Sequence, residues 1–461
     1  MRGTNYGRMG CRNSKALMRL LLTALLLCIS TALLPAASKI FPYPYTSHEL
    51  PNGLRLITIP TEFPNIVSVF IVVGAGSRNE VEPGKSGFAH LFEHLMFRGT
   101  PEFSSEKYQA ALRDAGAASN AFTTDDFTAY HTTFSKEDLP RILSMEADRF
   151  QHLSYEPGAF KTETLAVLGE YNKNSANPVS KLNETVRATA FKLHTYRHTT
   201  MGFLADIQAM PDAYDYSRQF FDRYYRPENT TIIVAGDVDA KQVRSLVEER
   251  WGAWKRGTFK VAIPVEPPQD GERTAQVEWP SATLPWISIS FRGPAYSDEG
   301  TEGAALDAIS SLGFNDTSPL YEKLIIEDQK ADVLRAGMAD HVDPELFSIT
   351  ARVKKQSDVA LVQQQILATL DEFAAKPVDA KKLETLKQHL RYEFALRLDN
   401  SEVIAQSVAQ YAGRRRTPES MNKDYENYDR LTPADIQRVA RKFFGEKNRT
   451  VVTLKSSESA K

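Results

Sequence analysis

Cysteine is almost missing from this chain. The 461 residues include two cysteines, Cys11 and Cys28, and both lie in the first 38 residues. If that segment is removed, the remaining chain has no thiol. It then cannot form a disulfide, use a cysteine nucleophile or bind a metal through thiolates. Any metal site must be built from histidine and carboxylate side chains.

The chain also has no excess of positively charged residues over negatively charged ones. The chain has 56 basic and 58 acidic residues and a net charge of −2. Residues 1–38 contain five basic residues and no acidic one, so their removal lowers the net charge to −7. Because an acidic surface repels phosphate backbones, we expect no nucleic-acid partner.

A hydrophobic run long enough to span a membrane is also lacking. The run LLLTALLLCISTALL covers residues 20–34, follows the basic segment and precedes PAASK, with small residues around a cleavage point. This layout is typical of a secretory signal. A membrane anchor is the alternative, but spanning a bilayer takes roughly 18 apolar residues or more. We therefore predict that residues 1–38 are a signal peptide, that the protein is exported to a bacterial periplasm, and that no stable membrane span remains.

The rest of the chain mixes strand and helix patterns and predicts an α+β fold. Strands are expected at 54–60 and 67–74, a β-rich segment at 120–134, and helices around 88–95, 106–115, 137–152 and 161–174. Residues 254–278 concentrate proline, glycine and charge, which is typical of a linker.

The two sides of this linker end alike. FFDRYYRPENTTIIVAGDV precedes it and KFFGEKNRTVVTLK ends the chain, with Asn229 and Asn448 in matching places. This repeat predicts two homologous halves, 39–253 and 279–461, each an α/β-sandwich-like layer of antiparallel-rich sheet and helices. Two unrelated α+β domains with similar endings are the alternative.

The segment HLFEH, residues 90–94, combines two histidines and a glutamate. At about 100° per residue, His90, Glu93 and His94 share one face of a helix, and the opposite face is apolar. Two histidines four residues apart can bind one divalent ion, and a glutamate beside them can act on a water molecule. A pair of structural histidines beside a surface glutamate is the alternative.

A zinc hydrolase needs a third protein ligand, and two glutamates qualify. Glu170 lies 76 residues after His94, and Glu163 precedes Glu170 by seven residues. Seven residues are close to two helical turns, so both side chains share one face of a helix. One can bind the metal while the other orients a ligand. Taken singly, each glutamate is better explained as a solvated surface charge.

With this spacing the sequence resembles the inverted zinc-motif peptidases of the pitrilysin, insulin-degrading enzyme and mitochondrial processing peptidase family. The resemblance covers residues 45–240 most strongly and continues to about 455. The stretches that carry it are NGLRL from Asn52, GSRNE from Gly76, GFAHLFEHLMFRGT from Gly87, NAFTTDDFTAY from Asn120 and YYRPENTTIIVAGDV from Tyr224.

The resemblance implies a zinc-dependent endopeptidase with one zinc ion per chain. Carried over by position, the zinc ligands are His90, His94 and Glu170, the general base is Glu93, and Glu163 supports the site. The substrate peptide is expected to add as a strand beside Asn120, Ala121 and Phe122.

One departure from the family lies in the second half. Family members that complete their own site carry an arginine and a tyrosine seven residues apart, which hold the substrate carbonyl. In SPLYEKLIIEDQKAD, these places are taken by Ile325 and Asp332, and neither donates a hydrogen bond to an oxyanion at neutral pH. Arg335 is the nearest substitute, but a helix-based donor displaced by ten residues rarely recovers the geometry.

We therefore predict that this chain is the zinc-bearing subunit of a heterodimer, in which a homologous partner subunit that lacks zinc supplies the arginine and tyrosine. The alternative is a noncatalytic peptide-binding or structural subunit of the same family, although such subunits typically lose the zinc motif.

Overall fold

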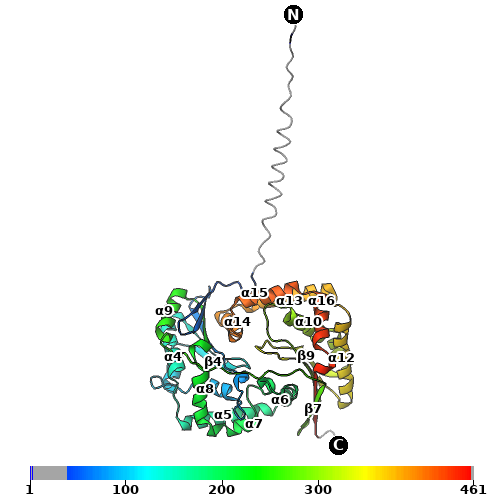
Figure 1. Cartoon of the computed structure of the whole chain (residues 1–461), viewed down its shortest axis with the longest axis horizontal. Coiled ribbons are helices and arrows are strands. Elements are labelled where there is room, and N and C mark those ends of the chain that lie inside the picture. The colour runs from blue at the N-terminus through cyan, green and yellow to red at the C-terminus, as the bar shows by residue number, and fades with distance from the viewer. Residues whose placement is uncertain (2, 4–38, 458–461) are drawn as a thin grey trace. The chain divides into compact units, whose positions relative to one another are not determined.

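The structure is a computed structural model, and it describes Met1, Gly3 and residues 39–457. The predicted signal peptide therefore lies outside the described residues, except for Met1 and Gly3. From Tyr43 onward the chain forms one compact unit with two β-sheets (Figure 1). In this described part, every helix is too short or too polar to cross a bilayer.

The first sheet has six strands in the order β1-β2-β6-β3-β5-β4. Only β2 and β6 pair in parallel, and the other neighbours are antiparallel. The strands are β1 Thr46–Glu49, β2 Arg55–Pro60, β3 Ile66–Val73, β4 Ala118–Thr123, β5 Thr128–Ser135 and β6 Thr230–Gly236.

The second sheet repeats this topology without a counterpart of β1. Its order is β7-β11-β8-β10-β9, with β7 and β11 parallel and the rest antiparallel. The strands are β7 Arg273–Trp279, β8 Trp286–Arg292, β9 Ala331–Gly337, β10 Leu346–Val353 and β11 Arg449–Ser456. The predicted α+β fold with two homologous, antiparallel-rich halves is confirmed.

Asn229 and Asn448 show the duplication at the level of single atoms. The side-chain amide of Asn229 donates to the carbonyl oxygens of Gly74 and Tyr224, at the end of β3 and of a helix. Asn448 donates to the carbonyls of Arg292 and Phe443, in the same places of the second half. Each asparagine directly precedes a strand. Its side chain links that point of the chain to the end of a helix and to the neighbouring strand.

Helices follow the strands in both halves. The helices of the first half are α2 Phe88–Leu95, α3 Ser105–Asp114, α4 Leu139–His152, α5 Pro157–Ser175, α6 Pro178–Ala190, α7 Leu204–Ala209, α8 Tyr214–Tyr224 and α9 Ala240–Trp251. Those of the second are α10 Glu302–Phe314, α11 Pro319–Tyr321, α12 Val359–Ala375, α13 Ala380–Arg397, α14 Ser401–Gly413, α15 Glu419–Arg430 and α16 Pro433–Phe443. Residues 252–272, between α9 and β7, contain no helix or strand.

The expected elements occur close to their predicted positions. The strands expected at 54–60 and 67–74 are β2 and β3, the β-rich segment forms the hairpin of β4 and β5, and the helices expected around 88–95, 106–115, 137–152 and 161–174 are α2 to α5. The boundaries differ by a few residues, because helix and strand ends depend on caps and pairing as well as on periodicity.

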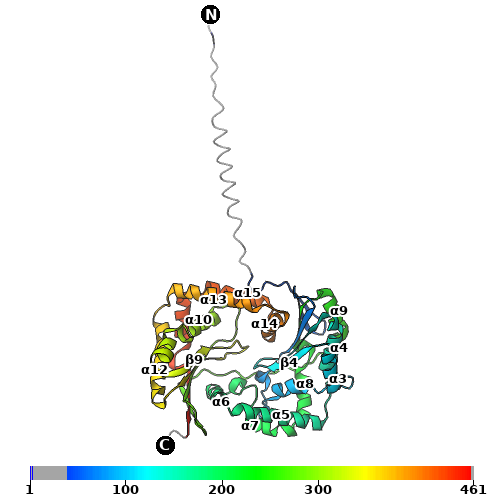
Figure 2. The ribbon, with the colours of Figure 1, turned by 180° about the vertical axis from the view of Figure 1, so that it is seen from behind.

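Each half packs one of its helices against the sheet of the other half. Helix α6 belongs to the first half but packs against β7, β8 and β11 of the second sheet. Its buried residues Leu182 and Val186 share an apolar cluster with Trp286 and Leu454 of that sheet. Helix α14 belongs to the second half and packs against β3 and β6 of the first sheet. Figure 2 shows both helices between the two sheets, from the reverse side of Figure 1.

A polar contact joins equivalent hairpins of the two halves. The loop between β4 and β5 contains Asp125 and Asp126, and the loop between β9 and β10 contains His341. The carboxylate of Asp125 lies 2.9 Å from His341 Nε2 and accepts a 2.7 Å hydrogen bond from Arg187 of α6. Asp126 accepts a 2.6 Å hydrogen bond from the Tyr196 hydroxyl. These groups are largely buried, and their hydrogen bonds offset the cost of that burial.

Candidate metal centre

Helix α2 begins at a position that requires glycine. Gly87 is its N-cap and has φ +91°, a conformation that L side chains rarely adopt. An added Cβ would also lie 2.7 Å from the Met201 carbonyl oxygen. The buried Glu80 carboxylate accepts hydrogen bonds from the backbone N–H groups of Gly87 (2.8 Å) and Ala89 (2.7 Å), which satisfies two free donors of the first turn. Burial raises the pKa of Glu80 to about 8, although both hydrogen bonds oppose the rise.

Helix α2 has the polar and apolar faces that its spacing of about 100° per residue predicts. Its apolar residues are at most 1% exposed and belong to the first core: Phe88, Leu91, Phe92 and Leu95. His90 is 7% exposed, and Glu93 and His94 are half-buried. The apolar face thus anchors the helix while the polar face points into the site.

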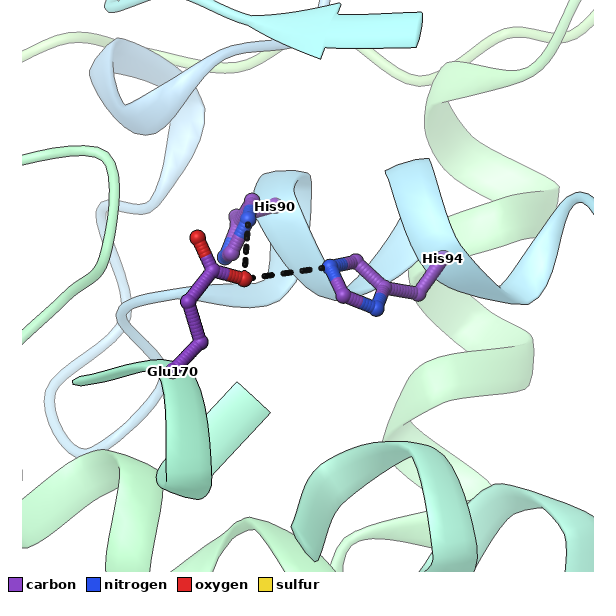
Figure 3. A group of neighbouring side chains, drawn as sticks. All are labelled: His90, His94 and Glu170. Atoms are coloured by element: carbon purple, nitrogen blue, oxygen red, sulfur yellow. Dashed lines mark ion pairs between the residues drawn. The ribbon is translucent and has the colours of Figure 1, made fainter. Parts of the chain in front are cut away.

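Helix α5 brings Glu170 to the two histidines. Glu170 Oε2 lies 3.6 Å from His90 Nε2 and 3.6 Å from His94 Nε2. Figure 3 shows one carboxylate oxygen of Glu170 facing both imidazole rings. The imidazole rings are 4.9 Å apart and nearly perpendicular. One ligand atom from each residue lies within 4.8 Å of the other two, and these three residues are the only group of this kind in the described chain.

This geometry fits a tetrahedral metal ion. Nitrogen and oxygen ligands bind zinc at about 2.0–2.2 Å, so neighbouring ligand atoms lie roughly 3.3–3.6 Å apart. Two of the three separations match that range. Two histidines and one glutamate also leave a fourth position for water or substrate, as in catalytic zinc sites. The residues present can therefore hold one zinc ion.

The His90 imidazole is held in the form that a metal ligand needs. Burial lowers the pKa of His90, and the neighbouring His94 lowers it further, against the opposing charges of Glu93 and Glu170. A lower pKa favours the neutral ring with a free nitrogen lone pair.

Glu163 approaches His94 from the side opposite Glu170. Its Oε2 lies 3.3 Å from His94 Nδ1, while its Oε1 is paired with the guanidinium of Arg98. A carboxylate at Nδ1 favours the tautomer whose Nε2 is free to bind a metal. Arg98 compensates the charge of this buried carboxylate. The sequence analysis did not single out Arg98, although it lies four residues after His94.

Glu93 has a partner on the neighbouring strand. Thr123 Oγ1, at the end of β4, donates a 2.7 Å hydrogen bond to Glu93 Oε2. The sequence analysis missed this residue. The only signal for it is its position, directly after the three residues expected to bind substrate.

A pocket lies beside the cluster and reaches the sheet edge. Glu93, His94 and Glu163 line it together with Asn120 and Ala121 of β4. In the described chain β4 pairs only with β5, so its other edge can accept an added strand. Phe122, the third residue expected to bind substrate, does not line the pocket. Its ring instead packs against the rings of Phe127 and His131.

Ile325 and Asp332 occupy the two positions at which family members carry arginine and tyrosine, and both residues make other contacts. Ile325 is partly buried against the second core. Asp332 pairs with Arg352 through two hydrogen bonds of 2.7 and 3.0 Å. Asp332 and Arg335 lie in strand β9 rather than in a helix, which corrects the expectation of a helix-based donor at Arg335.

Three further histidines lie in structural surroundings. His131 stacks on Phe70 with 4.7 Å between ring centroids. His194 Nε2 lies 3.0 Å from Asp343, and His198 is buried 3.8 Å from Glu80. None of the three joins the His90 cluster.

Two sequence profiles of one family match the chain. "Insulinase (Peptidase family M16)" matches residues 55–203, and "Peptidase M16 inactive domain" matches residues 213–390. A zinc protease, PqqE of Helicobacter pylori, is 29% identical over 89% of this chain and 93% of its own. The mitochondrial-processing peptidase subunit beta of Blastocladiella emersonii is 22% identical over 88% and 87%.

Comparison with solved structures supports the same family. The crystal structure of a protease from Helicobacter pylori superposes with a TM-score of 0.83 at 28% identity, over 90% of this chain and 99% of that one. The two α/β halves therefore have the two-domain fold of M16 peptidases. The chain belongs to the insulinase family of peptidases, family M16.

Proposed function

We propose that this protein is a zinc-dependent endopeptidase that hydrolyses peptides or unfolded polypeptide segments. The observation that carries the proposal is the convergence of His90 Nε2 and His94 Nε2 on one oxygen of Glu170, 3.6 Å from each. The similarity to a named zinc protease over most of both chains supports it.

The chemistry follows from the side chains around this point. His90, His94 and Glu170 would hold the zinc ion, which would supply the Lewis acidity that activates water and polarises a substrate carbonyl. Glu93 then takes a proton from the attacking water and delivers it to the leaving amine. Thr123 holds one Glu93 oxygen, which leaves the other free for the proton. Glu163 acts as a positioning residue because it contacts His94.

We propose that the substrate binds in an extended conformation along β4. Main-chain hydrogen bonds at the edge near Asn120 and Ala121 would hold the peptide across the pocket that Glu93 and His94 line. Such contacts depend little on sequence, so folded proteins are poor substrates and extended chains good ones.

A homologous partner subunit completes the site in this proposal. Ile325 and Asp332 offer no donor for the oxyanion that forms during hydrolysis. A relative of similar length is named as the beta subunit of mitochondrial-processing peptidase, which supports a role as one subunit of a dimer.

Two further parts of the proposal rest on the sequence. The basic and apolar pattern of residues 1–38 supports export to the periplasm. The functional division is a zinc-binding half at 39–253 and a second half; the predicted linker at 254–278 is too long by six residues, because β7 at Arg273–Trp279 already pairs with β11 of the second sheet.

The test is metal analysis combined with cleavage of a quenched fluorescent peptide, with and without the co-purified partner. We expect one zinc ion per chain and cleavage that a chelator abolishes and zinc restores. Glu93→Gln should retain zinc and lose turnover, because it removes the base but no ligand. His94→Ala should lose zinc.

The same experiment separates the alternative. A noncatalytic peptide-binding subunit would bind the peptide without cleaving it, even with zinc and the native partner present. Vigorous cleavage by the isolated chain would contradict the need for a partner, and zinc loss in Glu93→Gln would contradict the assignment of the base.

A further inference from the structure

A second pocket lies where the two halves and the segment between them meet. The first half contributes Arg55 of β2 and Glu228 of the short 3-10 helix before β6. The connecting segment contributes Arg256, and the second half contributes Arg415, two residues after α14 ends. The catalytic cluster contributes no residue to this pocket.

Positive charge dominates the lining. Its basic residues are Arg55, Arg223, Arg256, Lys260 and Arg415, and its acidic residues are Glu49 and Glu228. Arg223 is already paired with Glu82 at 2.9 Å. The rest of the chain is acidic without its first 38 residues, so this pocket is a local reversal of charge.

Within the described chain, Arg256 and Arg415 have no carboxylate in ion-pair contact, and Arg55 has only Glu49 opposite it in the β1–β2 pair. Arg55 donates to the carbonyl oxygen of Ala412 at 3.1 Å. Arg415 donates to the side-chain oxygen of Asn229 at 3.2 Å. The carboxylate of the half-buried Glu228 also lines the pocket: its Oε1 accepts a 2.8 Å hydrogen bond from the N–H of Gly257, and its Oε2 has no hydrogen-bond partner among the described residues.

Bringing such groups together without an anion is unfavourable. Burial lowers the pKa of Arg55 and the positive charge of Arg415 lowers it further, while the negative charge of Glu49 opposes both without cancelling them. Guanidinium groups remain charged at neutral pH, so this repulsion persists. A polyvalent anion between the arginines would remove it.

We propose that this pocket binds a phosphate-type oxyanion through Arg55, Arg256 and Arg415. The planar guanidinium fork matches phosphate oxygens and forms charge-assisted hydrogen bonds to them. Three arginines favour an anion with more than one negative charge over a single peptide carboxylate. Because the arginines come from both halves and the connecting segment, a bound anion links all three parts and stabilises the folded chain.

The test is calorimetric titration of the purified full-length protein with inorganic pyrophosphate at constant ionic strength, together with thermal unfolding. Arg256→Gln and Arg415→Gln each remove one charge from the pocket. Arg113→Gln removes an exposed arginine of α3 and serves as the control. A peptide with a free C-terminal carboxylate is titrated in parallel.

We expect saturable pyrophosphate binding that raises the melting temperature. Each pocket variant should weaken binding roughly tenfold, and the control should not change it. Binding that survives both pocket variants, or no binding beyond the effect of ionic strength, would overturn the proposal. Binding of the peptide carboxylate in place of pyrophosphate would overturn the phosphate assignment.

Discussion

The hydroxyl of Thr123 donates to Glu93 Oε2 at 2.7 Å, which ties the proposed base to the strand along which we place the substrate. The two residues come from different elements, α2 and the end of β4. Substrate binding and proton transfer therefore share one structural connection.

Replacing Thr123 should reveal this connection in the kinetics. Thr123→Val removes a hydrogen bond to a carboxylate, which contributes about 1.5–3 kcal/mol. We expect kcat to fall by roughly one to two orders of magnitude with a small change in KM and no change in bound zinc. Thr123→Ser restores the hydroxyl and should recover most of the activity. Failure of this rescue would show that the methyl group matters instead.

Glu163 should control metal affinity. Glu163→Gln keeps the shape but weakens the contact with His94 Nδ1, and loss of such support lowers metal affinity about 10–100-fold. Competition with a chromophoric chelator measures the change. Glu156→Gln, at the exposed start of α5, is the matched control. Equal affinities in the two variants would contradict the positioning role.

Alanine substitutions at Gly87 and Gly84 distinguish the cost of backbone strain from the cost of a steric clash. Both have positive φ, but an added Cβ meets the Met201 carbonyl at 2.7 Å only at Gly87. Gly84→Ala should cost about 1–2 kcal/mol through the left-handed backbone alone. Gly87→Ala should cost more and should also reduce zinc content, because it displaces the start of α2. Chemical denaturation and metal analysis provide the comparison.

His341 should make stability depend on pH. Burial lowers its pKa, but the hydrogen bond to Asp125 and the charges of Glu345, Asp125 and Asp126 outweigh burial and raise the pKa to about 9. Protonated His341 therefore stabilises the folded state fully below its ordinary value of 6.5, and this contribution is lost as pH rises toward 9.

The expected loss is on the order of 3 kcal/mol between these two pH values. Melting temperatures across this window should fall for the native protein. His341→Gln should be less stable at pH 6 and should show a shallower decline toward pH 9. An unchanged slope in the variant would assign the decline to other groups.

Local patterns in the sequence were sufficient to predict the expected helices and strands and the polar and apolar faces of α2. The apolar spacing of Phe88, Leu91 and Phe92 already placed His90 and His94 on the opposite side. The seven-residue separation of Glu163 and Glu170 likewise follows from helix geometry, and the structure brings Glu170 to both histidines and Glu163 to one.

Contacts between distant elements could not be read in this way. The bond from Thr123 to Glu93 depends on how β4 lies over α2, and periodicity carries no such information. The exchange of α6 and α14 is another example, because an amphipathic helix shows that it needs an apolar partner but not which sheet provides it. The position of Asp332 in β9 was missed because a short strand followed a π-helical turn at Glu322–Glu327.

The exchanged helices give the second half an indispensable part, although it contributes no metal ligand to the cluster. A fragment that stops after α9 would lack α14 and leave β3 and β6 uncovered on one side, while its own α6 would present Leu182 and Val186 to water. We therefore expect the fold around His90 and His94 to require both halves, so that a fragment of the first half alone exposes apolar surface.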